Sequence, residues 1–200
     1  MLWLKLFVFL ASLAPAIVFS GLAVAGAYSP DPGQALIIRF AHTATIFLLI
    51  TLSLKPIATL KGLRPVIRFS RMAGLFCFFY ALLHFLAYLA FKTGFMWSLF
   101  EMDLAKRPYV YVGMAAFVIL ALMAVTSTKW WQRRLKRNWK MLHRLVYLAL
   151  ILIIVHILWV ARSDVWWTVI YGTIGTLLLA WRARLHWLKR RSIAAENRPS

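Results

Sequence analysis

The sequence predicts an all-α integral membrane protein, a bundle of six transmembrane helices with both termini in the cytoplasm. Of its 200 residues, 63% are hydrophobic and the mean hydropathy is +0.77, so the chain is more apolar than a soluble domain of this size needs to be. Six apolar segments approach the length that crosses a bilayer. Most lysines and arginines lie in alternate connections between these segments, and this pattern favours one orientation of the bundle.

The connections between the apolar segments carry helix breakers and charges. An SPDPG turn at 29–33 follows the first segment, Lys55-Pro56 ends the second, and Arg107-Pro108 precedes the fourth. No repeat, soluble domain or low-complexity linker is visible, so we expect the whole chain, 1–200, to form a single domain. The expected helices are 6–27, 36–54, 73–92, 109–126, 143–161 and 165–182.

The first apolar segment ends in AVAGA at 23–27, which resembles the cleavage region of a signal peptide. However, the apolar stretch before it is longer than the usual core of a signal peptide, and only Lys5 precedes it. We therefore expect this segment to be retained as the first membrane helix.

The positive charges predict the orientation of the bundle. Nineteen of the 24 lysines and arginines fall at the N-terminus, in 55–72, in 127–144 or in the tail from residue 182, and five fall on the opposite side. The positive-inside rule then places both termini and the basic connections in the cytoplasm. A net charge of +19 also suits nucleic-acid binding, but the apolar segments leave no room for a soluble nucleic-acid domain, so we predict contact with lipid headgroups instead.

Two histidines occupy the same depth on different segments. At about 1.5 Å per residue, His84 in the third segment and His156 in the fifth both lie about 18–20 Å from the cytoplasmic end. Imidazoles at one level can bind the two faces of a haem iron. The alternative is that each histidine only forms a hydrogen bond within the bundle. The single cysteine and the absence of acidic residues from the segment middles argue against a zinc site and against a proton-coupled transporter.

Two further histidines lie in or beside the apolar segments. His143 begins the fifth segment at its cytoplasmic end, thirteen residues before His156. His42, in the second segment, falls near the depth of His84 and His156. It could compete as an iron ligand, donate to a haem carboxylate together with Arg39, or simply pack, and the sequence leaves these roles open.

Several motifs in order resemble a known family. They are RxxGL with a downstream LH within 68–91, RPY at 107–109, TST at 126–128, and WxxLHRLVY at 139–147 with a second histidine thirteen residues after the first. This pattern resembles MsrQ, formerly YedZ, the haem-binding membrane subunits of bacterial periplasmic methionine-sulfoxide reductase systems, within the wider ferric-reductase-like transmembrane group. The resemblance covers about 55–182 well and the N-terminal quarter loosely.

The resemblance implies a multi-pass protein of the bacterial inner membrane that contains haem b and FMN. It also implies electron delivery to MsrP, a periplasmic molybdenum enzyme that reduces oxidised methionines in proteins, so that catalysis occurs on the partner. The donor would be the quinone pool or a cytosolic flavin reductase. The family's histidines correspond to His84, His143 and His156. Because the third segment holds only His84, we do not expect a second haem held by two histidines. His143 could then ligate with a different partner, touch FMN or contact a quinone.

A flavin phosphate would need cationic donors near the cytoplasmic surface. Arg68, Arg71, Lys140 and Arg144 lie there, beside Trp139, whose ring could stack on a flavin. Arg71 is the sharpest candidate because it belongs to the RxxGL motif and a guanidinium matches the geometry of a phosphate. The alternative is that Arg71 only contributes to topology. Two other functions stay open for the chain: a haem subunit for another periplasmic oxidoreductase, and a small transporter or structural membrane protein.

Overall fold

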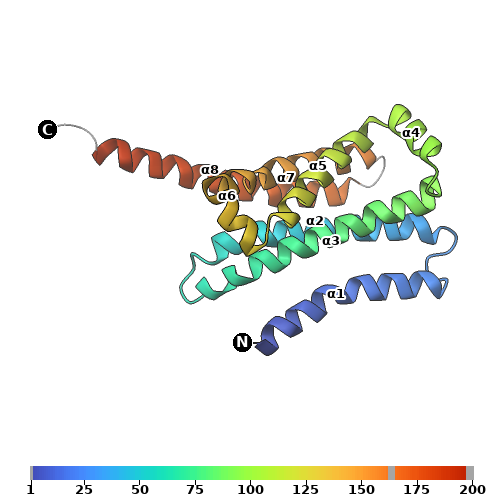
Figure 1. Cartoon of the computed structure of the whole chain (residues 1–200), viewed down its shortest axis with the longest axis horizontal. Coiled ribbons are helices and arrows are strands. Elements are labelled where there is room, and N and C mark those ends of the chain that lie inside the picture. Colours follow the sequence, from blue (N-terminus) through green and yellow to red (C-terminus); the bar gives the residue numbers. More distant parts are fainter. Residues whose placement is uncertain (1, 162–164, 197–200) are drawn as a thin grey trace.

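The computed structural model describes residues 2–161 and 165–196, and its regular structure within them is entirely helical (Figure 1). Two short helices, the 3-10 helix η1 (Arg64–Phe69) and the π-helical turn η2 (Leu89–Thr93), flank α3. The α-helices are α1 (Leu2–Val24), α2 (Pro32–Ile57), α3 (Ser70–Tyr88), α4 (Trp97–Lys106), α5 (Pro108–Val125), α6 (Lys129–Leu142), α7 (Leu145–Val160) and α8 (Trp166–Glu196).

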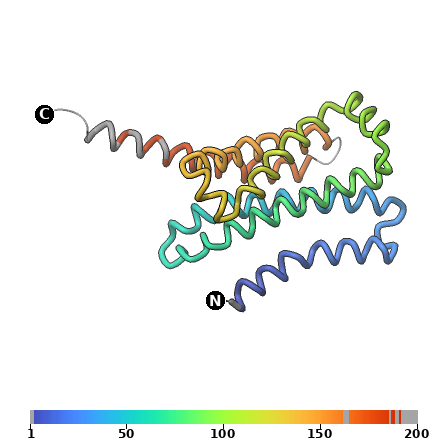
Figure 2. Tube along the Cα trace, in the orientation of Figure 1, coloured from blue at the N-terminus to red at the C-terminus, as the bar shows by residue number. Residues whose placement is uncertain are grey.

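The long helices run back and forth along one axis, so the chain connections gather at two ends (Figure 2). The start of α1, the α2–α3 connection, α6 and the last turns of α8 lie toward one end, which we call the basic end. The α1–α2 turn, η2, α4 and the start of α8 lie at the other, which we call the far end. The segments rich in lysine and arginine therefore lie on one side of the bundle, as the charge pattern predicts.

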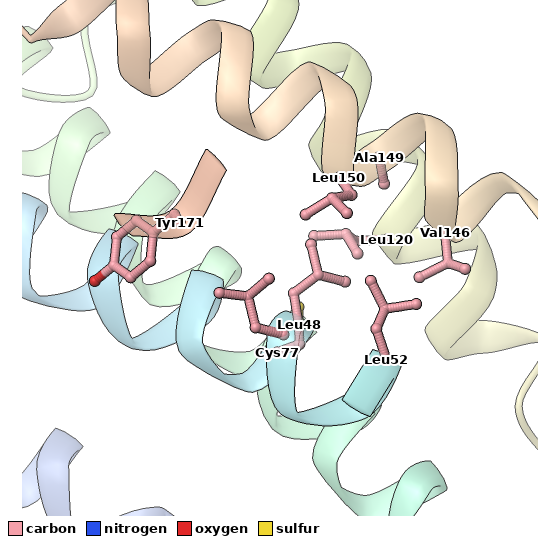
Figure 3. Packing of buried hydrophobic residues seen from close by; sticks show 9 residues of the cluster. Leu48, Leu52, Cys77, Leu120, Val146, Ala149, Leu150 and Tyr171 are labelled. Atoms are coloured by element: carbon pink, nitrogen blue, oxygen red, sulfur yellow. The ribbon is translucent and has the colours of Figure 1, made fainter. Parts of the chain in front are cut away.

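Two helix pairs, α2–α3 and α5–α7, form the centre of the bundle, and α8 packs beside them. Their shared core contains small and branched side chains from all of these helices (Figure 3). Ala149 and Leu150 of α7 are fully buried, and the thiol of Cys77 is buried as well. The labelled members of this core are Leu48, Leu52, Cys77, Leu120, Val146, Ala149, Leu150 and Tyr171.

Helix α1 lies at the periphery and packs on α2 and α3. The hydroxyl of Tyr80 on α3 donates to the backbone carbonyl of Ser12 at 2.6 Å and accepts from the backbone N–H of Ala16 at 3.2 Å. Large apolar side chains elsewhere on α1, such as Phe7 and Ile17, point outward. Such a surface suits a helix whose solvent is lipid, where the backbone is satisfied internally and the side chains need no water.

Four of the described helical stretches are long and apolar enough to cross a membrane: α1, α2, the η1–α3–η2 stretch and α5. A fifth is present if α6 and α7, which meet at a bend of 49°, count as one span. Alone, α7 has 16 residues, about 24 Å of helix, which is shorter than the roughly 30 Å hydrocarbon core. The chain is thus a multi-pass membrane protein. Each of the six predicted segments overlaps a helix, but within the described residues four or five stretches, not six, are long and apolar enough to span a bilayer.

Three helical elements were not expected from the sequence. Both η1 and α4 lie in stretches that were assigned to connections, and so does α6. Helix α6 begins after Thr128, whose side chain accepts a weak hydrogen bond of 3.4 Å from the backbone N–H of Trp131, and none of its residues is buried. His143 was expected to begin a helix, but it lies in the turn between α6 and α7.

Candidate functional site

The structure brings His84 of α3 and His156 of α7 together in the half of the bundle toward the far end. Their ring centres lie 6.4 Å apart, with the ring planes at 80° to each other. Both line one cavity between the α2–α3 pair and the α5–α7 pair, which we call the histidine cavity. Its remaining walls are mostly apolar, and they include Ala44, Phe117 and Leu120. The equal depth predicted for these two histidines thus corresponds to a shared site.

Each of the two imidazoles is held by a backbone carbonyl of the neighbouring helix. Nδ1 of His84 donates to the carbonyl of Ile37 at 2.9 Å, and Nδ1 of His156 donates to that of Tyr109 at 2.8 Å. A carbonyl only accepts, so the proton lies on Nδ1 in both rings and the lone pair lies on Nε2. This arrangement orients an imidazole and leaves Nε2 able to bind a metal.

The absence of a side chain at Gly113 on α5 allows His156 to reach its carbonyl partner. A Cβ at Gly113 would lie 2.8 Å from Cε1 and 2.9 Å from Nδ1 of His156, closer than real Cβ contacts. The imidazole therefore occupies the space that any larger residue would take. This glycine fixes where the ring of His156 packs against α5.

The two histidine–carbonyl hydrogen bonds, which we call the histidine anchors, are related by a constant shift in residue number. Each histidine follows its carbonyl partner by 47 residues. His156 lies 72 residues after His84 (156 minus 84), and Tyr109 lies 72 residues after Ile37 (109 minus 37). The α2–α3 and α5–α7 pairs thus hold their histidines in equivalent ways, although their sequences do not read as a repeat.

The separation of the rings fits one metal ion between them. Two imidazoles that bind opposite sides of a metal through nitrogen, at about 2.0–2.1 Å each, hold their ring centres roughly 6–6.5 Å apart. The observed 6.4 Å lies in this range. Among the described residues, no three His, Cys, Asp or Glu side chains gather where they could hold a metal ion, so further ligands would have to come from the bound group. A haem supplies four nitrogens of its own and takes two axial ligands from the protein.

A second cavity lies toward the basic end and contains Arg71 and His143, so we call it the arginine cavity. Trp139 also lines it, with its ring stacked on that of His143 at 4.0 Å between centres. Nδ1 of His143 donates to the carbonyl of Trp139 at 3.1 Å. The structure therefore groups two of the residues expected near a flavin, while one face of Trp139 packs against His143. Other polar side chains in its lining belong to Thr51, Ser70, Ser127 and Gln132.

His42 turns away from the histidine cavity. Its Nδ1 lies 2.8 Å from the hydroxyl of Tyr171 on α8, and its ring centre lies 5.2 Å from that of Trp167, with the planes at 63°. The guanidinium of Arg39 lies over the ring of Tyr28 at 4.5 Å. His42 thus packs between α2 and α8, and it does not line the cavity that holds the other two histidines.

Sequence reasoning missed several residues of the histidine cavity. The carbonyls of Ile37 and Tyr109 carry no sequence signal, because every residue has one. Gly113 stands in an apolar helix, where a lone glycine has many explanations. Lys92 and Arg107 line the cavity near the far end. The sequence counted both among the five charges opposite the basic connections, and Arg107 also in the RPY motif, but gave neither a binding role. Once the structure shows one of these carbonyls, the shift of 72 residues between the two histidines identifies the other.

Known proteins resemble this chain over most of its length. Residues 37–154 match the family described as "Ferric reductase like transmembrane component". The protein-methionine-sulfoxide reductase heme-binding subunit MsrQ of Xanthomonas euvesicatoria pv. vesicatoria (strain 85-10) is 41% identical over 173 residues, which cover 86% of this chain and 79% of the relative. Proteins of the same name from Xanthomonas oryzae pv. oryzae (strain MAFF 311018) and Xanthomonas axonopodis pv. citri (strain 306) are 40% identical over the same shares.

The family match, residues 37–154, includes Ile37, His84 and Tyr109 and ends two residues before His156. This chain therefore belongs to the ferric-reductase-like transmembrane family, and within it to the MsrQ subunits.

Proposed function

We propose that this protein is a transmembrane electron carrier that binds haem b between His84 and His156. The observation that carries this proposal is the pair of imidazoles 6.4 Å apart, each fixed through Nδ1 by a carbonyl. The name of the relatives, heme-binding subunit, supports the binding of a haem. The haem iron would supply the chemistry, a reversible one-electron change.

The chain's own residues would hold and tune that group. The carbonyls of Ile37 and Tyr109 keep the two rings in the binding tautomer, which raises the basicity of Nε2. The apolar walls exclude water, and burial of this kind sets a potential together with the hydrogen bonds to the ligands. Such a protein moves electrons and leaves the reduction of a substrate to a partner.

The proposal includes an arrangement in the membrane. All six segments, including α7 and the first half of α8, would cross the inner membrane as one domain, with the basic end in the cytoplasm. The grouping of the basic segments at one end supports this orientation through the positive-inside rule. The histidine cavity then lies toward the periplasm, where an electron would leave.

The arginine cavity would serve the cytoplasmic side of the path. Arg71 would bind the phosphate of FMN, and His143 would lie between flavin and haem. Their presence in one cavity supports this role. The electrons would come from the quinone pool or from a cytosolic flavin reductase. A carrier with a flavin near one surface and a haem near the other spans the bilayer with two redox groups.

The partner would be MsrP, the periplasmic molybdenum enzyme that reduces methionine sulfoxide in proteins. The relatives' name, which refers to a protein-methionine-sulfoxide reductase, supports a partner with this activity. A haem subunit that serves another periplasmic oxidoreductase is the nearest alternative. In that case the reduced protein would keep its haem but fail to transfer electrons to MsrP.

The test uses the full chain purified in detergent. We expect a low-spin haem spectrum, and after reduction we expect reoxidation that depends on both MsrP and a methionine-sulfoxide substrate. A protein without haem would contradict the carrier role and favour a transporter or structural protein. If the protein contains haem but MsrP plus substrate does not reoxidise it, the result would contradict only the assignment of MsrP as the partner.

A further inference from the structure

The histidine cavity has a charged rim near the far end. Lys92 and Arg107 line it there, and apart from the histidines they are its charged lining residues in the described part of the chain. No carboxylate of a described residue lines this cavity. Two cations on the rim can bind an anionic group that enters the cavity, because an anion beside mostly apolar walls needs a cationic partner.

Each cation lies close in the chain to one of the residues that form the two histidine–carbonyl hydrogen bonds. Lys92 lies in η2, eight residues after His84, which is about 12 Å of helical rise. Its long side chain can reach back along the helix. Arg107 caps the start of α5, two residues before Tyr109, whose carbonyl holds His156. The two cations thus approach the cavity from the two different helix pairs.

The existing partners of these cations leave donors for another anion. Lys92 Nζ lies 3.9 Å from Oδ2 of Asp31, an exposed pair of little expected strength. Arg107 has five N–H donors, and its recorded contacts engage Nε with Asp103 at 3.3 Å and Nη1 with the hydroxyl of Tyr109 at 3.2 Å. The hydrogen bond with Tyr109 raises the pKa of Arg107, so this residue stays a cation.

We propose that Lys92 and Arg107 bind the two carboxylates of the haem and so determine which way its carboxylate edge points. This inference rests on the proposed haem site. The rim has two cations, and haem b has two carboxylates, its propionates. Binding of the propionates by Lys92 and Arg107 would turn the carboxylate edge of the haem toward the far end of the bundle. Lys92 and Arg107 act as positioning residues, since the iron is held by the histidines.

The test compares haem with haem dimethyl ester, in which both carboxylates are blocked. The haem-free full chain in detergent is titrated with each compound, using Lys92→Gln, Arg107→Gln and the double variant. Loss of one charged hydrogen bond should weaken binding of haem about tenfold, and the double variant should lose more. Binding of the dimethyl ester should be equal in all variants and in the unaltered chain.

Lys106→Gln is the matched control, because Lys106 is an exposed lysine in α4 that does not line the cavity. It should bind both compounds like the unaltered chain. The reduction potential provides a second readout: each neutral variant should shift it downward, because a nearby cation favours the reduced iron. Equal weakening for haem and for its dimethyl ester, or no weakening for either, would overturn this inference. If the unaltered chain binds no haem, the proposed function itself fails.

Discussion

The histidine cavity and the arginine cavity are each lined by two residues that lie 72 positions apart in the chain, yet the two cavities differ in chemistry. His84 and His156 are related by the 72-residue shift, and so are Arg71 and His143 (143 minus 71). Toward the far end, both equivalent positions hold histidine, and the two rings face one shared cavity. Toward the basic end, one position holds histidine and the other arginine.

This difference separates the roles that the two cavities can have. Two imidazoles with Nδ1 protonated present two lone pairs, which is what an iron with two open positions binds. An arginine has five donors and no acceptor, so it binds anions rather than metal cations. The two levels therefore present different groups: imidazole nitrogens that suit a metal toward the far end, and a guanidinium that suits an anion toward the basic end.

The largest effect should follow from removing a histidine of the matched pair. His84→Ala and His156→Ala should each abolish or severely reduce the low-spin haem spectrum, because one axial ligand is lost. The measurement is the absorption spectrum of the purified variants at equal protein concentration. His42→Ala is the control, since His42 contacts Tyr171 and lies outside the cavity, and it should retain haem.

Gly113→Ala should disturb the same site without removing a ligand. The new methyl group would lie 2.8 Å from Cε1 of His156, so the ring must shift away from the Tyr109 carbonyl. We expect a loss of about 1–3 kcal/mol, the usual cost of overpacking, seen as weaker haem retention on dilution. Gly21→Ala, at a position with nothing within 4 Å, should behave like the unaltered protein. Equal haem retention in both variants would contradict the assigned position of His156.

Arg71→Gln tests the other cavity. Loss of a charged hydrogen bond to the flavin phosphate should weaken FMN binding by about 1.5–3 kcal/mol while the haem stays in place. The flavin-to-protein ratio across a dilution series measures this effect, and haem content reports on folding. Lys61→Gln, which removes a charge from the same end but outside the cavity, should leave the ratio unchanged. If Arg71→Gln also leaves it unchanged, Arg71 contributes only to topology.

His143→Ala should have the smallest effect on the haem. His143 lies about 20 Å from His156 along the chain direction of α7, so the low-spin spectrum should persist. Electron uptake from the cytoplasmic side should slow, because the residue beside Trp139 in the arginine cavity is lost. The rate of haem reduction in a stopped-flow experiment measures this. A variant that loses all haem and keeps its flavin would contradict the separation of the two cavities.

The long helices could be predicted from the sequence, because a lipid solvent requires continuous apolar stretches that hydropathy detects. The amphipathic α6 could not, since its many basic residues are equally typical of a loop on the cytoplasmic side. Helix α4 has ten residues, too few to stand out by periodicity. The turn at His143 also escaped prediction, because the apolar run of α7 gives no signal for where the helix begins.

The shared level of His84 and His156 could be predicted from the sequence, because helical rise converts residue number into height. Depth does not report rotation about the helix axis, so His42, at a similar depth, could not be separated from His84 before the structure was known. In the structure, His42 faces α8 and His84 faces α7. The cations of the rim were equally hidden, since a topological charge and an anion-binding charge look alike in sequence.

Chemical rescue tests the central claim most directly, that His84 and His156 bind one iron from opposite sides. His84→Gly and His156→Gly are purified and oxidised, and electron paramagnetic resonance spectra are recorded before and after imidazole is added. We expect a low-spin signal in the unaltered protein, its loss in each variant, and its return when free imidazole fills the vacated position. A low-spin signal that persists in both variants without imidazole would contradict the account.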